Sequence, residues 1–210
     1  MKILVYGSKE FAMVVREVVL DCGHQFVGFV DDLNPAEGDV VGAWDLAEKK
    51  YSRDHAVVIA VGYKNLAARW AVYSRVTTSG FSVATLIHPN AYVARTATVK
   101  DGAIIMAGAN VDSNALVNEV SVLWPTSVLS HDSVIGPNTF LSPGAIICGS
   151  TRVGRDCFIG AGATVVDHCV VPDGAFVKAG SLYKGRSFDA RTASEAHGAS
   201  DAFELGPGAY

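Results

Sequence analysis

One histidine of the sequence lies beside a carboxylate within a run of strand-like residues. The stretch VLSHDSVIG, residues 128–136, places His131 directly before Asp132. Imidazole has an ordinary pKa near neutrality, so it is well suited to take a proton from a reacting group. A lone histidine is more often a plain surface residue. The hypothesis that His131 is a general base therefore depends on the elements that position it.

Those elements follow a six-residue period. Every sixth residue from Ile87 to Val177 is aliphatic, and every sixth residue from Ala91 to Ser181 is small. Internal repeats indicate the architecture before any other signal. This one predicts a triangular coil, in which each hexad is a short strand and a tight turn and three hexads make one turn. Aliphatic residues point inward and small residues lie at corners. About five coils of parallel strands follow, with exposed edges only at the two ends.

The period also predicts the surroundings of the histidine. Leu129 points into the coil and Ser133 lies at a corner, so His131 faces outward. A residue lies roughly above the one three hexads earlier, which places Gly149 one coil above His131. We expect this glycine to leave room for a ligand. His168, in VVDHCV, lies two coils further and one residue out of register, and we interpret it as a surface residue.

The first 86 residues have another pattern, in which strand-like runs alternate with helical spacing. Ser8 could cap a first helix and Gly23 could end it, and a later helix covers residues 65–78. Strands are predicted over 2–6, 25–32, 55–62 and 81–89. The alternation predicts a small parallel, Rossmann-like α/β sheet with ligands at the carboxyl ends of its strands.

Polar residues and glycines lie at those strand ends. They are Gly7, Ser8, Lys9, Asp31, Asp32 and Gly62. The first turn reads GSKEFA and lacks a GxGxxG pattern, so a nucleotide or nucleotide-sugar is a better expectation than a dinucleotide. An aspartate of the pair would accept a hydrogen bond from ribose or base, and N–H groups at the helix start would meet phosphate. Alternatively, the two aspartates form only a solvated turn.

Composition excludes several classes of protein. The net charge is −4, so we expect neither a nucleic-acid nor a membrane-surface partner. The four cysteines show no CxxC spacing, which favours reduced thiols in a cytoplasmic protein and argues against zinc. The histidines do not cluster, so we expect no metal site. We read no signal peptide and no apolar run long enough for a membrane span.

The order of the two halves resembles the sugar O-/N-acyltransferase family, which includes sialic acid O-acetyltransferases and the bacillosamine-pathway N-acetyltransferase. The resemblance rests on the junction LIHPNAYV (86–93) and the rung SVLSHDSVIG (127–136). It implies a Rossmann-like nucleotide-sugar domain over 1–86 and a left-handed parallel β-helix over 87–185. A polar tail, 186–210, follows.

The resemblance also implies roles for residues. His131 would be the general base, Asp132 would orient or charge-stabilise it, and acetyl-CoA would lie between two subunits of a homotrimer. Substrate contacts are expected from the strand-end residues above and from Trp124. Donor contacts are expected from Phe140, Gly149, Ala161, Ala179 and Gly180.

These inferences predict an acetyl-CoA-dependent N-acetyltransferase acting on a nucleotide-linked deoxyamino sugar in glycan or secondary-metabolite synthesis. Two alternatives remain open. The chain could acetylate a sugar hydroxyl, which the loop GSKEFA favours because Phe11 stands where relatives have a histidine. It could also be a non-catalytic, sugar-binding solenoid, because Trp124 and Phe140 depart from the family pattern.

Overall fold

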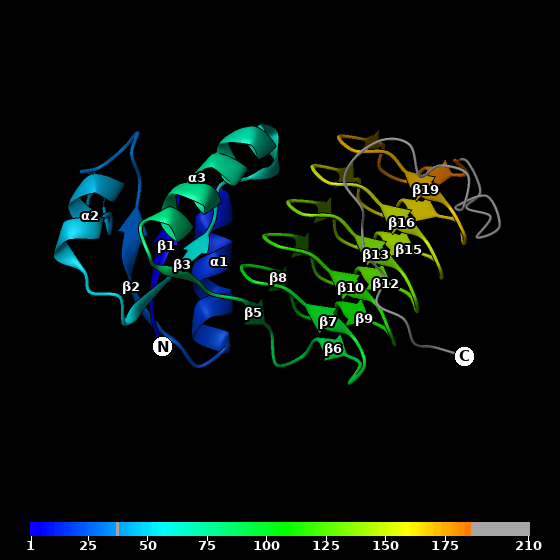
Figure 1. Ribbon diagram of the computed structural model, residues 1–210, viewed down its shortest axis with the longest axis horizontal. Coiled ribbons are helices and arrows are strands. Elements are labelled where there is room, and N and C mark those ends of the chain that lie inside the picture. Colours follow the sequence, from blue (N-terminus) through cyan, green and yellow to red (C-terminus); the bar gives the residue numbers. More distant parts are fainter. Residues whose placement is uncertain (37, 186–210) are drawn as a thin grey trace.

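The computed structural model describes residues 1–36 and 38–185. An α/β domain is followed directly by a parallel β-solenoid (Figure 1). The predicted polar tail, 186–210, lies outside the described residues. Within the described part of the chain, none of the helices has the length and apolar character that a membrane span requires.

The N-terminal domain is a four-stranded parallel sheet in the order β2-β1-β3-β4, which confirms the Rossmann-like prediction. Its strands are β1 (Lys2–Tyr6), β2 (Gln25–Val30), β3 (His55–Ile59) and β4 (Ser82–Val83). Its helices are α1 (Glu10–Asp21), α2 (Trp44–Lys50) and α3 (Leu66–Thr78), with a 3₁₀ turn, η1, over Tyr63–Asn65. The sequence pattern had not predicted α2.

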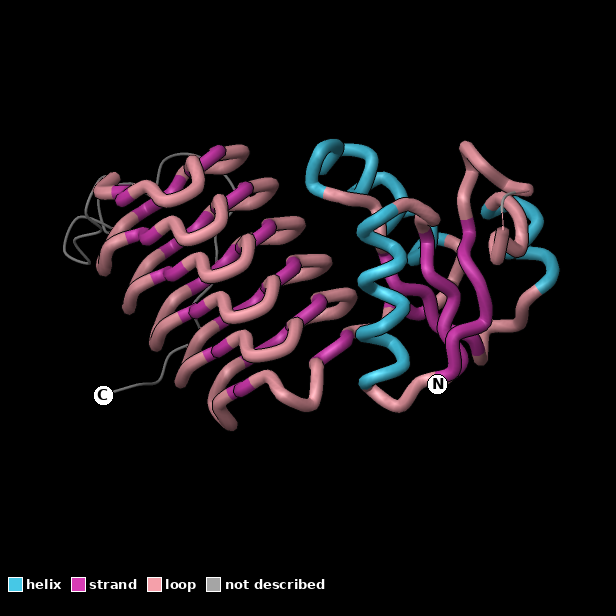
Figure 2. The backbone as a smooth tube through the Cα atoms, turned by 180° about the vertical axis from the view of Figure 1, so that it is seen from behind, coloured by secondary structure: helices cyan, strands magenta, loops and turns pink. Residues whose placement is uncertain are grey.

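Helices cover both faces of this sheet. The apolar positions Ala12, Val15 and Val19 of α1 have helical spacing and are fully buried. They pack on the sheet face that looks toward the solenoid, so α1 lies between the sheet and the coils (Figure 2). Trp44 of α2 and Val76 of α3 pack on the other face.

The solenoid consists of three parallel sheets whose strands are two residues long. Face 1 contains β5 (Leu86–Ile87), β8 (Ile104–Ile105), β11 (Val122–Leu123), β14 (Phe140–Leu141), β17 (Phe158–Ile159) and β20 (Phe176–Val177). Face 2 contains β6 (Tyr92–Val93), β9 (Asn110–Val111), β12 (Val128–Leu129), β15 (Ile146–Ile147), β18 (Thr164–Val165) and β21 (Leu182–Tyr183). Face 3 contains β7 (Thr98–Val99), β10 (Leu116–Val117), β13 (Val134–Ile135), β16 (Arg152–Val153) and β19 (Val170–Val171).

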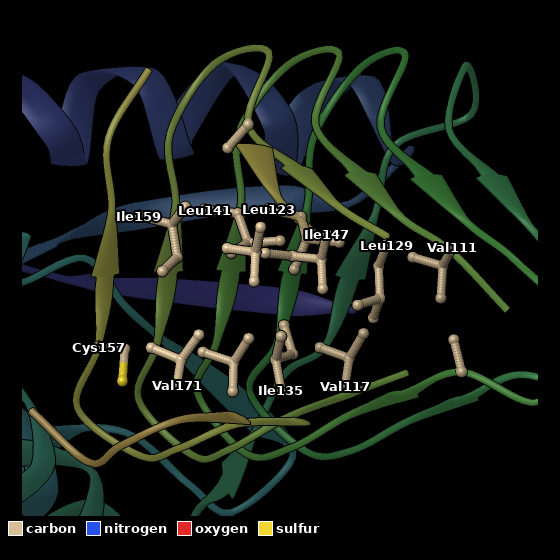
Figure 3. Packing of buried hydrophobic residues seen from close by; sticks show 14 of the residues in the cluster. Val111, Val117, Leu123, Leu129, Ile135, Leu141, Ile147, Cys157, Ile159 and Val171 are labelled. Carbon is tan, nitrogen blue, oxygen red and sulfur yellow. The ribbon is translucent and has the colours of Figure 1, made fainter. Parts of the chain in front are cut away.

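The second residue of each strand fills the interior, as the six-residue period predicts. Val111, Leu129 and Ile147 stack on face 2 at zero exposure, one coil apart (Figure 3). At the open end of the solenoid, where no coil covers it from below, the inward residue Ile87 is 42% exposed. Burial of this aliphatic column is the main stabilising contribution to the coils.

The small residues at the corners also form hydrogen bonds. Ser133 Oγ donates to the carbonyl of Cys148 at 2.9 Å, and Thr139 Oγ1 donates to the carbonyl of Gly154 at 2.9 Å. These carbonyls belong to the next coil. Serine and threonine therefore fit the narrow corner and also satisfy a buried acceptor, which the size pattern alone did not indicate.

The junction differs from the prediction of one strand over 81–89. Ser82–Val83 pairs with β3, whereas Leu86–Ile87 pairs with β8 in face 1. Leu86 therefore belongs to the solenoid rather than to the N-terminal domain. The chain passes from one sheet to the other without a linker, and the outward residues Leu86, Ile104, Val122 and Phe140 of face 1 are buried against the N-terminal domain. At the far end of the face, Phe176 is 67% exposed.

Candidate active site

His131 and Asp132 form a hydrogen-bonded pair at an exposed corner of the solenoid, between faces 2 and 3. Nδ1 of His131 lies 2.8 Å from Oδ2 of Asp132. The imidazole side chain is 56% exposed. An ionised carboxylate only accepts hydrogen bonds, so Nδ1 carries the proton and Nε2 keeps its lone pair. The pair is therefore arranged to accept a proton at Nε2.

The turn fixes the carboxylate. Asp132 has φ 57°, in the left-handed region that aspartate tolerates better than most residues. Its N–H donates to the carbonyl of Ser113 at 3.0 Å, and its Oδ1 accepts from Asn114 Nδ2 at 3.0 Å. Hydrogen bonds from His131 and Asn114 lower the pKa of Asp132. Asp132 is thus ionised at neutral pH and holds the ring of His131 in one orientation.

Gly149 lies one coil above, as the period predicts. A Cβ atom at this position would lie 2.7 Å from both Cε1 and Nε2 of His131. The expectation that the glycine leaves room for a ligand needs correction, because the imidazole itself occupies this space. Among the described residues, nothing accepts a hydrogen bond from the Gly149 N–H. A free donor therefore lies beside the ring.

A cleft opens at the carboxyl ends of β1, β2 and β3. Its inner chamber has a volume of about 430 Å³ and is lined by six predicted residues: Gly7, Ser8, Lys9, Asp31, Asp32 and Gly62. Its outer chamber has a volume of about 460 Å³ and reaches the solenoid at Trp124 and Phe140. The chambers adjoin, since both are lined by Lys9, Ala60, Val61, Gly62 and Asn65. The structure thus brings the strand-end residues together.

Asp31 is bonded largely within the chain. Its carboxylate accepts from Ser8 Oγ and from the N–H groups of Leu33 at 2.8 Å and Asn34 at 2.9 Å. Burial opposes ionisation, but these hydrogen bonds outweigh it and lower the pKa of Asp31. The prediction that Ser8 caps α1 is wrong. Lys9 is the N-cap, and its ammonium group offers no acceptor to a helix N–H. The Ser8 hydroxyl donates to Asp31.

Asp32 is also held from inside the domain. It accepts from the N–H of Trp44 at 2.8 Å, from Tyr6 Oη at 2.6 Å and from Arg75 at 2.8 Å. Burial opposes its ionisation, but these bonds and the Arg75 charge lower its pKa. The acidic pair therefore shapes the cleft wall, and its lone pairs are already partly used.

Gly7 is needed where two strand ends approach closely. It has φ 120°, and a Cβ there would lie 2.8 Å from the carbonyl oxygen of Ala60. In the first turn of α1, the ring of Phe11 stacks on Trp124 with centroids 5.5 Å apart. Phe11 thus contributes to the contact between the domains.

Phe140 lies elsewhere than expected. It was predicted to contact the donor, but it is fully buried between the two domains, with Phe11 at 5.7 Å and Tyr63 at 6.0 Å between ring centroids. The reason is its position as the outward residue of β14, on the face that the N-terminal domain covers. Its edge borders the outer chamber beside Trp124.

The remaining predicted donor residues lie on two corners. Gly149 shares the His131 corner, between faces 2 and 3. Ala161, Ala179 and Gly180 follow β17 and β20, and so lie at the corner between faces 1 and 2. Trp124 follows β11 and lies at that corner too. Within one chain, β12 separates the cleft from the base.

Sequence reasoning missed one residue beside the cleft. Arg69 of α3 is fully buried, and its guanidinium bonds the main chain of both domains. The sequence did contain a signal for Arg69, because it lies on the same helix face as Val72 and Val76. A charged residue that interrupts an apolar stripe indicates a buried polar contact. Across residues 1–36 and 38–185, no group of three or more histidine, cysteine or acidic side chains could hold a metal ion.

Residues 2–76 match the family model of the PglD N-terminal domain. No curated protein sequence shows a significant match to the chain.

Similar solved structures include the acetyltransferase domain of PglB from Neisseria gonorrhoeae FA1090. It is 27% identical with a TM-score of 0.81, over 90% of this chain and 93% of that one. The same domain in complex with acetyl coenzyme A is 26% identical with a TM-score of 0.76, over 88% and 93%. PerB from Caulobacter crescentus, in complex with CoA and GDP-perosamine, is 25% identical with a TM-score of 0.67, over 85% and 94%.

Proposed function

We infer that this chain, which fits the hexapeptide-repeat family of sugar acyltransferases, transfers the acetyl group of acetyl-CoA to the amino group of a nucleotide-linked deoxyamino sugar. The observation that carries the proposal is the His131–Asp132 pair, set beside the free N–H of Gly149 at an exposed corner. The two-chamber cleft supports it with space for a nucleotide and a sugar. The relatives solved with acetyl-CoA, or with CoA and GDP-perosamine, support the same donor and acceptor class.

The residues suit direct transfer. The amine nitrogen of the sugar forms a bond to the thioester carbonyl carbon, and Nε2 of His131 takes the proton that the amine loses. The N–H of Gly149 stabilises the negative charge that develops on the carbonyl oxygen. The carbon–sulfur bond then breaks, and the proton passes from His131 to the departing sulfur. Asp132 stabilises the imidazolium between these two steps.

A covalent acyl-enzyme is disfavoured by the cysteines. Burial raises the pKa of Cys22, Cys148, Cys157 and Cys169, so none is a ready thiolate at neutral pH. Reduced thiols also support the proposed cytoplasmic location, where acetyl-CoA and nucleotide-sugars for glycan synthesis would be available.

We place the complete site between subunits of a homotrimer. Face 2 separates the cleft from the base, and three of its outward residues are apolar and exposed: Tyr92 57%, Ile146 38% and Leu182 54%. The outward residues between them are the half-buried Asn110, Val128 and Thr164. Packing of face 2 around a threefold axis would bring the cleft of one copy to the His131 of the next. It would also bring Ala161, Ala179 and Gly180 opposite Gly149, leaving a groove for the pantetheine arm.

One observation favours the second candidate, O-acetylation of a sugar without a diphosphate. Glu10 lies in the first turn of α1 and lines the outer chamber. Its negative charge opposes a phosphate at that helix start, where N–H groups would otherwise bind one.

Thiol release from acetyl-CoA tests both candidates. The panel contains UDP-, dTDP- and GDP-linked amino sugars and free sialic acid, with products identified by mass and by hydroxylamine lability. We expect a hydroxylamine-stable amide with a nucleotide-linked amino sugar. A labile ester on free sugar would replace the first candidate by the second. Absence of CoA binding would contradict both and favour the non-catalytic solenoid.

A further inference from the structure

A buried arginine without an acidic partner connects the two domains. Arg69 is 0% exposed. Its Nη1 donates to the carbonyls of Ile59 at 2.6 Å and Val61 at 3.1 Å, and its Nη2 donates to the carbonyl of Val120 at 2.6 Å. Within the described residues no carboxylate bonds it, and burial lowers its pKa to about 9. Burying an unpaired cation is costly, so its three acceptors indicate a specific role.

The first two acceptors, the carbonyls of Ile59 and Val61, lie beyond the end of the edge strand β4. β4 is two residues long and pairs only with Ala56 and Val57 of β3. Beyond it, the carbonyls of Ile59 and Val61 have no neighbouring strand. The guanidinium takes the place of that strand and satisfies both. It thereby fixes the segment Ala60–Gly62, which lines both chambers of the cleft.

The third acceptor belongs to the solenoid. Val120 has φ 55°, an unfavourable conformation for a β-branched residue. It lies in the turn before β11, the strand that leads to Trp124. The guanidinium carbon also lies 5.1 Å from the ring centroid of Phe140. One side chain therefore spans from Ala60–Gly62 to the coils that carry Trp124 and Phe140, which are the opposite walls of the outer chamber.

We propose that Arg69 is a positioning residue that sets the spacing of these two walls and so fixes the acceptor sugar relative to the base. The proposal rests on the function inferred for the cleft. Arg69 touches no substrate; it acts through the main chain of Ala60–Gly62 and of the Val120 turn. A planar fork of donors is required, and the compact ammonium of lysine cannot reach three carbonyls in this arrangement.

Steady-state kinetics of Arg69→Lys and Arg69→Gln test the role, with Arg155→Ala as the matched control. Arg155 also joins the solenoid to α3, since its guanidinium lies 5.0 Å from the Trp70 ring centroid, but it does not border the cleft. We expect the acceptor KM to rise about tenfold or more in both Arg69 variants, with the acetyl-CoA KM within about twofold of wild type. The control should change neither.

Chemical rescue separates positioning from general destabilisation. Methylguanidinium added to Arg69→Ala should restore the acceptor KM toward the wild-type value and leave Arg155→Ala unaffected. An unchanged acceptor KM in Arg69→Lys would overturn the proposal. So would equal rises in both KM values without rescue, because they indicate a merely structural role.

Amide hydrogen exchange distinguishes a failure of this proposal from a failure of the proposed function. Exchange of peptides covering residues 59–65 needs no substrate, and we expect it to be about tenfold faster in Arg69→Lys with the coils beyond residue 141 unchanged. If the wild type acetylates no acceptor but this local change occurs, the proposed acetyltransferase function is contradicted and the positioning role of Arg69 is supported. If exchange of residues 59–65 is unchanged, or if exchange rises throughout the chain, the positioning role of Arg69 is contradicted.

Discussion

Two histidine–aspartate pairs lie on the same corner of the solenoid, two coils apart. In one, Nδ1 of His131 lies 2.8 Å from Asp132; in the other, Nδ1 of His168 lies 3.1 Å from Asp167. The exposed fractions of the two imidazole side chains are similar, at 56% and 60%. Local chemistry therefore does not distinguish the two pairs.

The difference lies in register. Asp167 occupies the column of His131, and His168 occupies the column of Asp132, with φ 53°. The ring of His131 lies against Gly149, whereas the N–H of His168 donates to the Gly149 carbonyl at 3.0 Å. Among the described residues, the ring of His131 thus lies beside a glycine whose N–H has no partner. The neighbouring coil, rather than the dipeptide, defines the candidate site.

Removing the two imidazoles tests this contrast with the largest expected effect. His131→Ala should lower kcat by about 10²–10⁴-fold, the usual contribution of a general base, and His168→Ala should change it less than about twofold. The measurement is CoA release at saturating acceptor. Comparable losses in both variants would mean that register does not select the base.

The carboxylates should show a smaller contrast in the same direction. Asp132→Asn keeps a residue that tolerates the left-handed turn but removes the charge that orients His131, so we expect kcat to fall about 10–100-fold. Asp167→Asn should have no effect on kcat. An Asp132→Asn enzyme with wild-type kcat would remove Asp132 from the mechanism.

Gly149→Ala tests the contact that separates the pairs. The backbone at Gly149 does not need a glycine, but a Cβ would lie 2.7 Å from Nε2, so the imidazole must move. We expect kcat to fall about tenfold with little change in thermal stability. Ser113→Ala, one coil below His131 in the same column, is the control and should keep full activity.

A stability measurement contrasts the His131 partner with a structural carboxylate. Asp31 is 8% exposed, and its pKa is lowered in the folded state. The ionised Asp31 carboxylate therefore raises the free energy of unfolding at pH values above the ordinary carboxyl pKa. This stabilisation is lost as pH falls through the lower pKa of the folded state. Asp31→Asn should cost about 1–2 kcal/mol in urea unfolding at pH 7. The difference should begin to shrink below about pH 4, the ordinary carboxyl pKa, and should keep shrinking as pH falls through the lower folded value. Asp132→Asn should cost less stability than Asp31→Asn at pH 7, because solvent screens the exposed His131–Asp132 pair. A loss as large as that of Asp31→Asn would make Asp132 structural.

Much of this architecture could be predicted from residue types. The six-residue period predicted the stacking of Leu129 on Ile147 and the place of Gly149, because a coil of equal hexads leaves one register. Alternating strand and helix patterns predicted the parallel sheet and the residues at its carboxyl edge. The pattern could not predict that the Ser8 hydroxyl donates to Asp31 rather than accepting from an N–H group of α1, because only the folded geometry brings the Asp31 carboxylate within reach.

The sequence by itself determined the solenoid, its register and the candidate pair, since these follow from periodic burial and local turn chemistry. Tertiary structure decided which face the N-terminal domain covers, and so buried Phe140. It also placed Arg69 against carbonyls 10 and 51 residues away along the chain. Such contacts join segments whose separation in sequence carries no periodic signal. The bond to Ile59 therefore arises only when α3 packs on the sheet, and the bond to Val120 only when the two domains pack together.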